Sequence, residues 1–384
     1  MKVTEKIKEK FLSVQCITKK VTAFALSAVM VCSLTACGSD FEGHIDTDID
    51  YSQESGISAG DRIGVSMPTK DLQRWVQDGE NMQSSLKKTG FVVDLQYADN
   101  EIDTQISQIQ KMIDSKCKVL VVAAIDGTKL SNVLNKAKSA GISVIAYDRL
   151  IMDTDAISYY ATFDNYLVGK LQGQYIVDAL GLEDTDKTFN IELFTGSPDD
   201  NNCKFFFGGA MDVLQPYIDA GTLVVPSGET EREECSIQDW STDAAKERME
   251  NLLADYYDDG TELDAILSSN DSVALGIAEA LESDYSGKQP VLTGQDCDIN
   301  SVKNILNGTQ SMSVFKDTRD LASKVVEMVQ AIINEEEVPV NDTESYDNGT
   351  GVIPSYLCEP VYADEENYKE ILMDSGYYTE DQLK

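Results

Sequence analysis

The chain has 384 residues and a formal net charge of -36, from 67 acidic and 31 basic side chains. Such an acidic surface repels phosphate, which excludes nucleic acid as a partner. The one histidine is His44. The body of the protein that follows therefore cannot build a Ser-His-Asp triad, a histidine-bearing zinc site or a histidine general base. We find no Walker-type phosphate loop and no GxGxxG after a strand, and we expect no catalytic residues, no cofactor and no metal.

Residues 1–36 have the pattern of an export signal. Six lysines precede an apolar stretch from Val21 to Leu34, which is too short to span a bilayer comfortably. Small residues then directly precede Cys37, as a lipobox requires. We predict that Cys37 becomes a lipidated N-terminus on the outer face of the cytoplasmic membrane. A signal anchor with an incidental cysteine is the alternative.

Residues 37–60 are acidic, contain Ser and Gly, and lack apolar periodicity. This composition is typical of a solvated tether. We expect folding to begin near Asp61.

From Asp61 the apolar pattern alternates between strand and helix periods. Strands are predicted at 63–67, 91–97, 119–124 and 143–147, with helices between them over 72–86, 102–113 and 130–140. This order predicts a parallel sheet covered by helices.

A second series begins near Asn165 with the same alternation. Strands are predicted at 189–194, 223–225, 264–268, 291–293 and 311–315, with helices between them and a last helix of the series that ends near Ile333. A final strand through Tyr356 and a helix through Tyr368 to Leu372 are expected to return to one of the lobes. This is too much sheet for one ordinary domain. We predict an α/β protein of two similar lobes, each a parallel sheet flanked by helices, with a ligand between them and more than one chain crossing at the hinge. The boundaries are 61–163 plus 317–353 for the N-terminal lobe, and 164–316 plus 354–384 for the C-terminal lobe.

Five cysteines follow Cys37, and none shows CxxC spacing. Several lie in or beside apolar runs, which favours small buried hydrophobic residues over a disulfide framework. They are Cys117, Cys203, Cys235, Cys297 and Cys358.

Polar side chains follow three of the predicted strands. Asp148 and Arg149 come after Tyr147, Asn270 after Ser269, and Asp296 after Gln295. Because the carboxyl ends of parallel strands face the binding crevice, these groups can converge on one small molecule. Carboxylates only accept and guanidinium only donates, so together they suit the hydroxyls of an uncharged polyol such as a sugar. A surface ion pair for Asp148 and Arg149, and a turn role for Asp296, are the alternatives.

Asp271 precedes a helical run, and we expect it to cap that helix and leave the amide of Asn270 free for a ligand. Trp75 and Trp240 can each stack on the apolar face of a pyranose, although Trp75 also fits its helix's apolar stripe and Trp240 can pack onto the next helix. Arg74 and Lys316 are candidate donors or solvated charges.

Several stretches, in this order, resemble the monosaccharide-binding receptors of bacterial ABC importers, of the xylose-binding and multiple-sugar-binding type. The resemblance covers nearly everything after Asp61. It is carried by Gln73-Arg74-Trp75, Ala146-Tyr147-Asp148-Arg149, the Gly196 to Asn202 loop, Ser269-Asn270-Asp271, Gly294-Gln295-Asp296, Phe315-Lys316 and the run from Val352 to Leu357.

The resemblance implies the periplasmic binding protein type 1 fold, with two lobes closing on a pyranose between two tryptophans. The residues it implies as ligands are Arg74, Trp75, Asp148, Arg149, Asn202, Trp240, Asn270, Asp296 and Lys316. It further implies a monomer that captures a pentose or hexose and delivers it to an ABC permease driven by a separate ATPase subunit. The lipobox differs from the freely diffusing periplasmic members and suggests a cell bounded by one membrane.

Two other functions remain open from the sequence. The protein could be a sugar-sensing receptor whose closed state is bound by a signalling or chemotaxis partner. A glycoside-acting enzyme could use Asp148 and Asp296 as acid and base.

Overall fold

Six strands form the first sheet of the computed structural model, which describes residues 60–384. The strand order is β11-β5-β4-β3-β1-β2, and every pairing is parallel. The strands are β1 (Arg62–Met67), β2 (Val92–Tyr97), β3 (Val119–Val122), β4 (Ser143–Tyr147), β5 (Tyr159–Phe163) and β11 (Ser355–Cys358).

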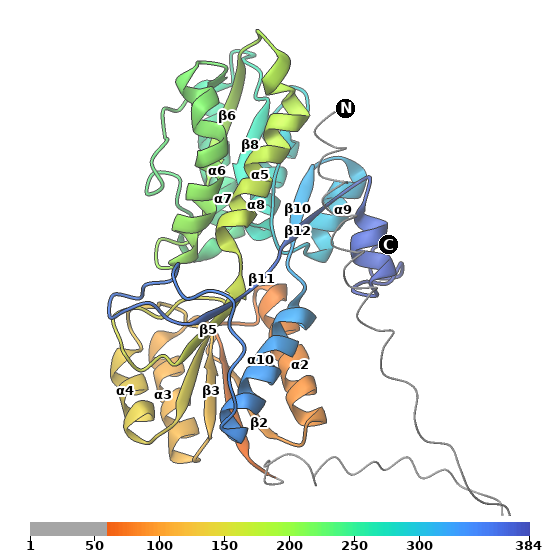
Figure 1. The fold of residues 1–384 in the computed structure, drawn as a ribbon. Helices are drawn as coiled ribbons and strands as arrows, with labels where there is room; N and C mark the ends of the chain where they lie inside the picture. Colours follow the sequence, from red (N-terminus) through yellow and green to blue (C-terminus); the bar gives the residue numbers. More distant parts are fainter. Residues whose placement is uncertain (1–59) are drawn as a thin grey trace, which may run out of the picture. The chain divides into compact units, whose positions relative to one another are not determined.

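Helices cover both faces of this sheet (Figure 1). They are α2 (Gln73–Lys88), α3 (Ile102–Asp114), α4 (Ser131–Ser139) and α10 (Thr318–Asn334). Side chains alternate along a strand, so Val119 and Val121 of β3 join one apolar cluster with α2 and α10. Leu120 and Val122 point the other way and pack with α3 and α4. Burial on both faces explains why the strand is a continuous apolar run.

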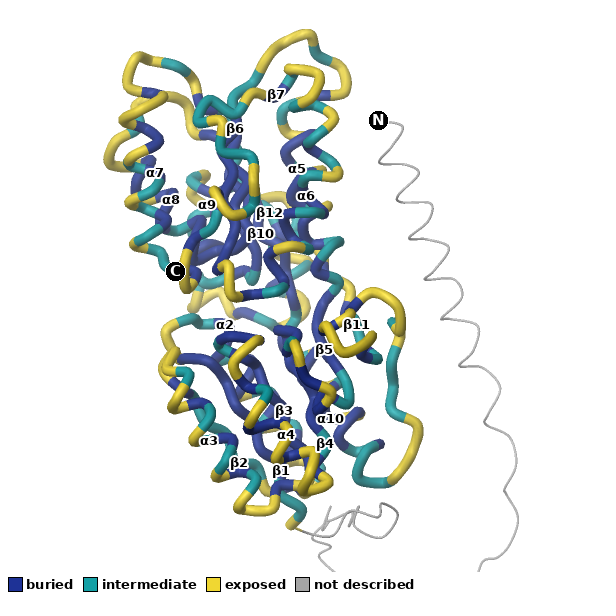
Figure 2. The backbone as a smooth tube through the Cα atoms, turned by 90° about the vertical axis from the view of Figure 1, so that its left-hand side faces the viewer, coloured by how far each residue is buried: buried dark blue, intermediate teal, exposed yellow. Residues whose placement is uncertain are grey.

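The second lobe repeats the plan with a four-stranded parallel sheet in the order β7-β6-β8-β9. Its strands are β6 (Phe189–Phe194), β7 (Leu223–Val224), β8 (Ala265–Ser268) and β9 (Val291–Leu292), and its helices are α5 (Asn165–Leu180), α6 (Asn202–Asp219), α7 (Thr242–Tyr256), α8 (Asp271–Asp284) and α9 (Ile299–Asn307). Strand β10 (Met312–Phe315) continues this sheet through a bridge between Gln295 and Val314. Figure 2 shows the buried strands enclosed by helices whose outer sides are exposed.

The chain passes between the lobes at three places. It leaves the first sheet after β5 for α5, returns between β10 and α10, and leaves again between β11 and β12 (Val361–Asp364), which pairs antiparallel with β10. The expected boundary at 354 is wrong in one detail, because Ser355–Cys358 pairs with β5 and extends the first sheet. We propose that the first lobe comprises 61–163 and 317–358, and the second lobe the rest of 164–384.

The strands and helices expected in both series are present, with ends that differ by a few residues. Strands β5 and β12 were not expected. The final helix, expected through Tyr368 to Leu372, is present as a π-helix at Lys369–Asp374. All five cysteines after Cys37 are free and buried, which confirms their expected packing role. The predicted export signal, Cys37 and tether lie outside the described residues. No helix within residues 60–384 is long and apolar enough to cross a bilayer.

Glycines let α5 and α6 pack at very short range. A Cβ at Gly169 would overlap the carbonyl oxygen of Phe206, and a Cβ at Gly209 would overlap the carbonyl oxygen of Tyr166. Because α5 directly follows β5 and α6 begins at Asn202, this packing sets where Asn202 lies relative to the chain crossing after β5.

Gly209→Ala should lower the free energy of unfolding by about 2 kcal/mol or more, because the added methyl overpacks backbone against backbone. The neighbouring Gly208→Ala is the matched control. Its Cβ would meet nothing closer than the Tyr166 ring at 3.8 Å, so the gain of up to about 1 kcal/mol in helix propensity should appear instead. Urea unfolding of both variants checks this; equal destabilisation would show that the short interhelical contact is not what requires Gly209.

Candidate functional site

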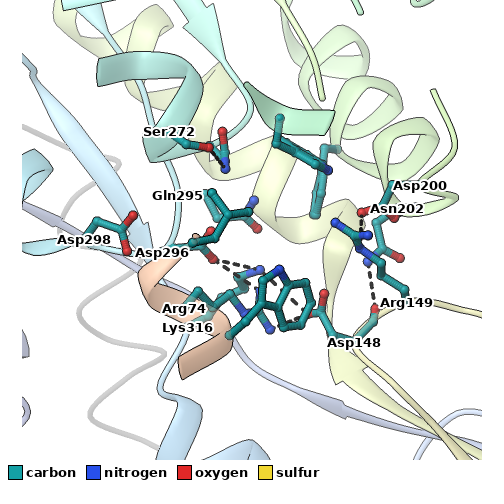
Figure 3. A pocket seen from close by; sticks show the side chains of 15 residues that line it. Arg74, Asp148, Arg149, Asp200, Asn202, Ser272, Gln295, Asp296, Asp298 and Lys316 are labelled. Atoms are coloured by element: carbon teal, nitrogen blue, oxygen red, sulfur yellow. Dashed lines mark hydrogen bonds and ion pairs between the residues drawn. The ribbon is translucent and has the colours of Figure 1, made fainter. Parts of the chain in front are cut away.

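A cavity lies between the two lobes, at the carboxyl ends of their strands. All nine residues expected to bind a ligand line it: Arg74, Trp75, Asp148, Arg149, Asn202, Trp240, Asn270, Asp296 and Lys316. Figure 3 shows Arg74 and Lys316 beside the carboxylates of Asp148 and Asp296, with Arg149, Asp200 and Asn202 grouped on another side. The structure therefore brings together groups separated by up to 242 positions in the chain.

Arg74, in the first turn of α2, contacts three carboxylates. Its Nε donates to Asp78 Oδ2 at 2.8 Å, one terminal nitrogen contacts Asp148 Oδ1, and the other contacts Asp296 Oδ1 at 3.3 Å. Burial alone would lower the pKa of Arg74, but these carboxylates together raise it well above its ordinary value. Asp78 is itself fully buried and accepts a hydrogen bond from the Tyr147 hydroxyl. The guanidinium is therefore held in one orientation, and its charge is permanent.

Asp148 directly follows β4 with a left-handed backbone (φ 59°), which turns its carboxylate towards Arg74. Its carbonyl oxygen accepts from the Tyr160 hydroxyl at 2.6 Å and from Asn202 Nδ2 at 2.7 Å. Although burial alone raises the pKa of Asp148, Arg74 and Lys316 lower it below the ordinary value. This carboxylate is thus a fixed hydrogen-bond acceptor, and it lacks the raised pKa that a general acid needs.

Lys316 lies at the crossing between β10 and α10 and is almost fully buried. Its Nζ is 3.0 Å from Asp296 Oδ1 and 3.9 Å from Asp148 Oδ1. Asp296 has a positive φ of 97°, and its N–H donates to Val314 O at 2.8 Å, so the backbone between β9 and β10 sets the direction of its carboxylate. Asp148, Asp296, Arg74 and Lys316 form one cluster that joins both lobes at the hinge.

Arg149 and Asp200 form a second contact between the lobes. Arg149 Nε is 2.9 Å from Asp200 Oδ2, and one terminal nitrogen donates to the carbonyls of Ala124 and Ile125 at 3.1 Å each. Asn202, at the start of α6, donates from Nδ2 to Asp148 O, and its Oδ1 lies 3.1 Å from the Tyr160 hydroxyl, whose shorter contact is with Asp148 O. In this state Asn202 holds the two lobes together across the cavity wall.

The two indoles are buried in the apolar clusters of different lobes and both line the cavity. The guanidinium carbons of Arg74 and Arg149 lie 5.1 and 5.2 Å from the centre of the Trp75 ring. Trp240 has a positive φ of 58°, packs edge-on to Phe206 and lies against Gly196, where a Cβ would overlap its ring. Both indole N–H groups are buried without a hydrogen-bond partner. Each tryptophan therefore packs in the apolar cluster of its own lobe and also lines the cavity. Stacking on a sugar ring stays a prediction for both.

The expected cap of α8 is wrong. Asn270 is the N-cap, and its Oδ1 accepts from Val273 N at 3.0 Å, while its Nδ2 donates to Ser272 Oγ at 2.8 Å. Asp271 instead is fully buried and accepts from the Ser313 hydroxyl at 2.8 Å. The β-region backbone of Asn270, with ψ 175°, is what the N-cap requires, so the amide is less available than expected.

Six further residues line the cavity and were not expected as ligands: Leu72, Asp200, Phe206, Ser272, Gln295 and Asp298. Asp200 and Gln295 lie inside motifs noted in the sequence. The position of Gln295 directly before Asp296 at a strand end is the signal that could have identified it. Phe206 lies in the second turn of α6 and Asp298 is the N-cap of α9, and tertiary packing brings both to the cavity.

The site has balanced charge. Three cations, Arg74, Arg149 and Lys316, face the carboxylates of Asp148, Asp200 and Asp296, while burial raises the pKa of the next carboxyl, Asp298, to about 7 and Asp296 adds to the rise. The lining of the cavity therefore combines donors and acceptors, and its cations are matched by carboxylates. This arrangement suits a neutral, hydroxyl-rich guest whose groups both donate and accept.

Known proteins have sequences and folds similar to those of this chain. Residues 63–337 match the family described as periplasmic binding protein domain. A solved structure, an ABC transporter solute binding protein from Clostridium phytofermentans with bound β-D-glucose, is 62% identical, covers 84% of this chain and 100% of its own, and has a TM-score of 0.83. The multiple sugar-binding periplasmic protein SbpA of Azospirillum brasilense is 51% identical over 326 residues, 84% of this chain and 91% of that protein. The D-xylose-binding periplasmic protein of Escherichia coli strain K12 is 35% identical over 322 residues, 84% of this chain and 92% of that protein.

The Asp298 carboxyl should make the stability of the protein depend on pH. Because burial raises its folded-state pKa to about 7, the folded state keeps a proton that the unfolded state loses near pH 4. The free energy of unfolding therefore falls as pH rises from about 4 to about 7, and the cost persists above that range. Asp298→Asn cannot ionise, so it should stabilise the protein more at pH 8 than at pH 5.

Urea unfolding of Asp298→Asn and the parent at both pH values measures this difference. The exposed Asp258→Asn is the control for a change of surface charge. Burial raises the pKa of Asp271 and the charge of Asp298 raises it further, so the difference between variant and parent includes the response of Asp271. If Asp298→Asn changes the free energy of unfolding equally at pH 5 and pH 8, the raised pKa of Asp298 is contradicted.

Proposed function

The chain belongs to the periplasmic binding protein domain family, and we propose that it captures a neutral monosaccharide, a pentose or hexose, between its lobes and delivers it to an ABC permease. The observation that carries the proposal is the cavity between the lobes, where two indoles accompany balanced sets of cations and carboxylates. The sugars named for the similar proteins, glucose and xylose, are of this class.

The chemistry of the cavity fits a pyranose. Arg74, Lys316 and Arg149 supply donors, and Asp148 and Asp296 supply acceptors, so charge-assisted hydrogen bonds can saturate each hydroxyl. Trp75 and Trp240 supply flat apolar surfaces for the C–H faces of the ring. A charged guest would upset the balance of buried charge, which is costly in a site of low dielectric.

Capture requires the two lobes to move relative to each other. Trp75 and Asp148 come from the first lobe, whereas Trp240 and Asp296 come from the second. A sugar that contacts both sets favours the closed state through interactions that the open state lacks. The three chain crossings allow bending while keeping the lobes in register.

The carboxylates do not support the alternative of a glycoside-acting enzyme. Asp148 and Asp296 contact the same guanidinium of Arg74 instead of flanking a space from opposite sides. The lowered pKa of Asp148 keeps it ionised, so Asp148 cannot be the protonated carboxyl that an inverting or retaining pair needs. These features favour binding over hydrolysis.

The location and partners of the receptor form part of the same proposal. The lipobox ending at Cys37 supports a lipid anchor on the outer face of the cytoplasmic membrane. The receptor would then act as a monomer that presents sugar to a permease driven by a separate ATPase subunit.

Asp148→Ala should raise the Kd for sugar by about 100-fold or more, because it removes a charged acceptor and leaves part of the Arg74 and Lys316 charge unpaired. Asp78 and Asp296 still hold Arg74, so the ligand-free variant should fold. Calorimetry with D-glucose and D-xylose, together with circular dichroism, measures both properties. Asp155→Ala, an exposed acid of the same lobe paired with Lys138, is the control. Unchanged affinity in Asp148→Ala would refute the assignment of the pocket.

Cys37→Ser should move the protein from the membrane fraction to the soluble fraction of the producing cell, because a serine cannot carry the thioether-linked lipid. Membrane fractionation followed by immunoblotting checks this. Cys203→Ser, at one of the buried cysteines, is the control and should stay with the membrane. Retention of Cys37→Ser in the membrane would favour the signal-anchor alternative.

A further inference from the structure

A second cavity, the outer cavity, adjoins the first and is lined by residues of both lobes. We propose that this outer cavity is a subsite for the next sugar unit of a neutral disaccharide, so that the receptor takes short oligosaccharides as well as monosaccharides. The inference rests on the proposed function, since the first unit occupies the inner cavity.

The two cavities share part of their lining, because Leu72, Trp75, Arg149 and Trp240 line both of them. In the proposed complex the glycosidic bond lies beside these shared residues, with one ring in the inner cavity and the next in the outer cavity. Closure around the first ring does not require the second unit to be buried completely.

Both lobes contribute polar groups to the outer cavity. Asp126 follows β3 of the first lobe, and its Oδ1 accepts from Thr128 N and Oγ1, each at 2.7 Å. Its Oδ2 has only Lys129 nearby, at 3.9 Å, beyond hydrogen-bond distance. This second oxygen can therefore accept from a hydroxyl of the guest.

The rim on the second lobe is already ordered. Gln238 Nε2 donates to Asp199 Oδ2 at 3.1 Å, and Asp239 N donates to Ser197 Oγ at 3.2 Å. Asp239 has a positive φ of 58°, as does Trp240, so the same tight turn places the rim and the indole. A preorganised rim loses little entropy when a guest binds.

Apolar side chains complete the outer cavity and match a sugar ring. Leu72, Ile102 and Ile125 line it together with faces of the indoles. The C–H groups of a ring can pack on these residues while its hydroxyls reach the carboxylates and amides.

The charges of the outer cavity favour a neutral second unit. Three carboxylates, Asp126, Asp199 and Asp239, line it with a single cation, Arg149, which is already paired with Asp200. An anionic unit such as a sugar phosphate would meet this excess of negative charge. The geometry thus selects hydroxyl-bearing units without an acidic group.

The test is calorimetry on the mature protein with D-glucose and D-xylose, and with maltose and cellobiose as α- and β-linked disaccharides. The double variant Asp199→Ala/Gln238→Ala changes two exposed side chains that line the outer cavity and not the inner one. We expect at least one disaccharide to bind, and the double variant to weaken it by about tenfold or more while monosaccharide Kd values stay within about twofold. Glu282→Ala, an exposed acid elsewhere on the second lobe, should change neither.

Monosaccharide binding without any binding of the disaccharides would overturn the subsite and leave the proposed function intact. Equal weakening of both ligand classes by the double variant, or no weakening of the disaccharide, would also overturn it. Failure of all four sugars to bind would instead count against the proposed function itself.

Discussion

The site depends on one buried guanidinium. Arg74 lies in a helix of the first lobe and contacts Asp78 on the same helix, Asp148 at the end of β4 and Asp296 on the second lobe. A buried charge without partners would cost several kcal/mol, so the carboxylates must stay where the guanidinium can reach them. That requirement fixes the start of α2, the turn after β4 and the approach of the second lobe to the first.

Closing the lobes therefore completes an electrostatic network as well as an apolar one. Arg74 to Asp296 and Arg149 to Asp200 connect the lobes by charge, and Asn202 connects them through the carbonyl of Asp148. A neutral polyol can join such a network because each hydroxyl both donates and accepts, without adding charge. The same network explains why the loss of one charged residue leaves its partner with an unpaired buried charge, which is costly.

The rigid parts of the fold serve this arrangement. Glycines bring α5 and α6 into direct backbone contact, which sets where Asn202 and Phe206 meet the cavity. A left-handed backbone sets the direction of three side chains at loop positions. Asp148, Asp296 and Trp240 all have positive φ values and all line the cavity. Backbone strain of this kind persists where surrounding structure holds it, and it concentrates at binding sites.

The sequence by itself determined the alternation of strand and helix, the two lobes, the absence of histidine chemistry from the folded body, and the polar residues at strand ends, because these follow from local periodicity and from the shared edge of parallel strands. It did not reveal β5, whose short run is defined by pairing with β4 and with β11 almost two hundred residues later. It also misplaced the cap of α8, since Asn270 and Asp271 are both good caps and only burial of Asp271 against Ser313 decides between them. The meeting of Arg74 with Asp296, and the outer cavity beside Trp75 and Trp240, were decided by the packing of one lobe against the other. Such contacts join residues that no local pattern connects.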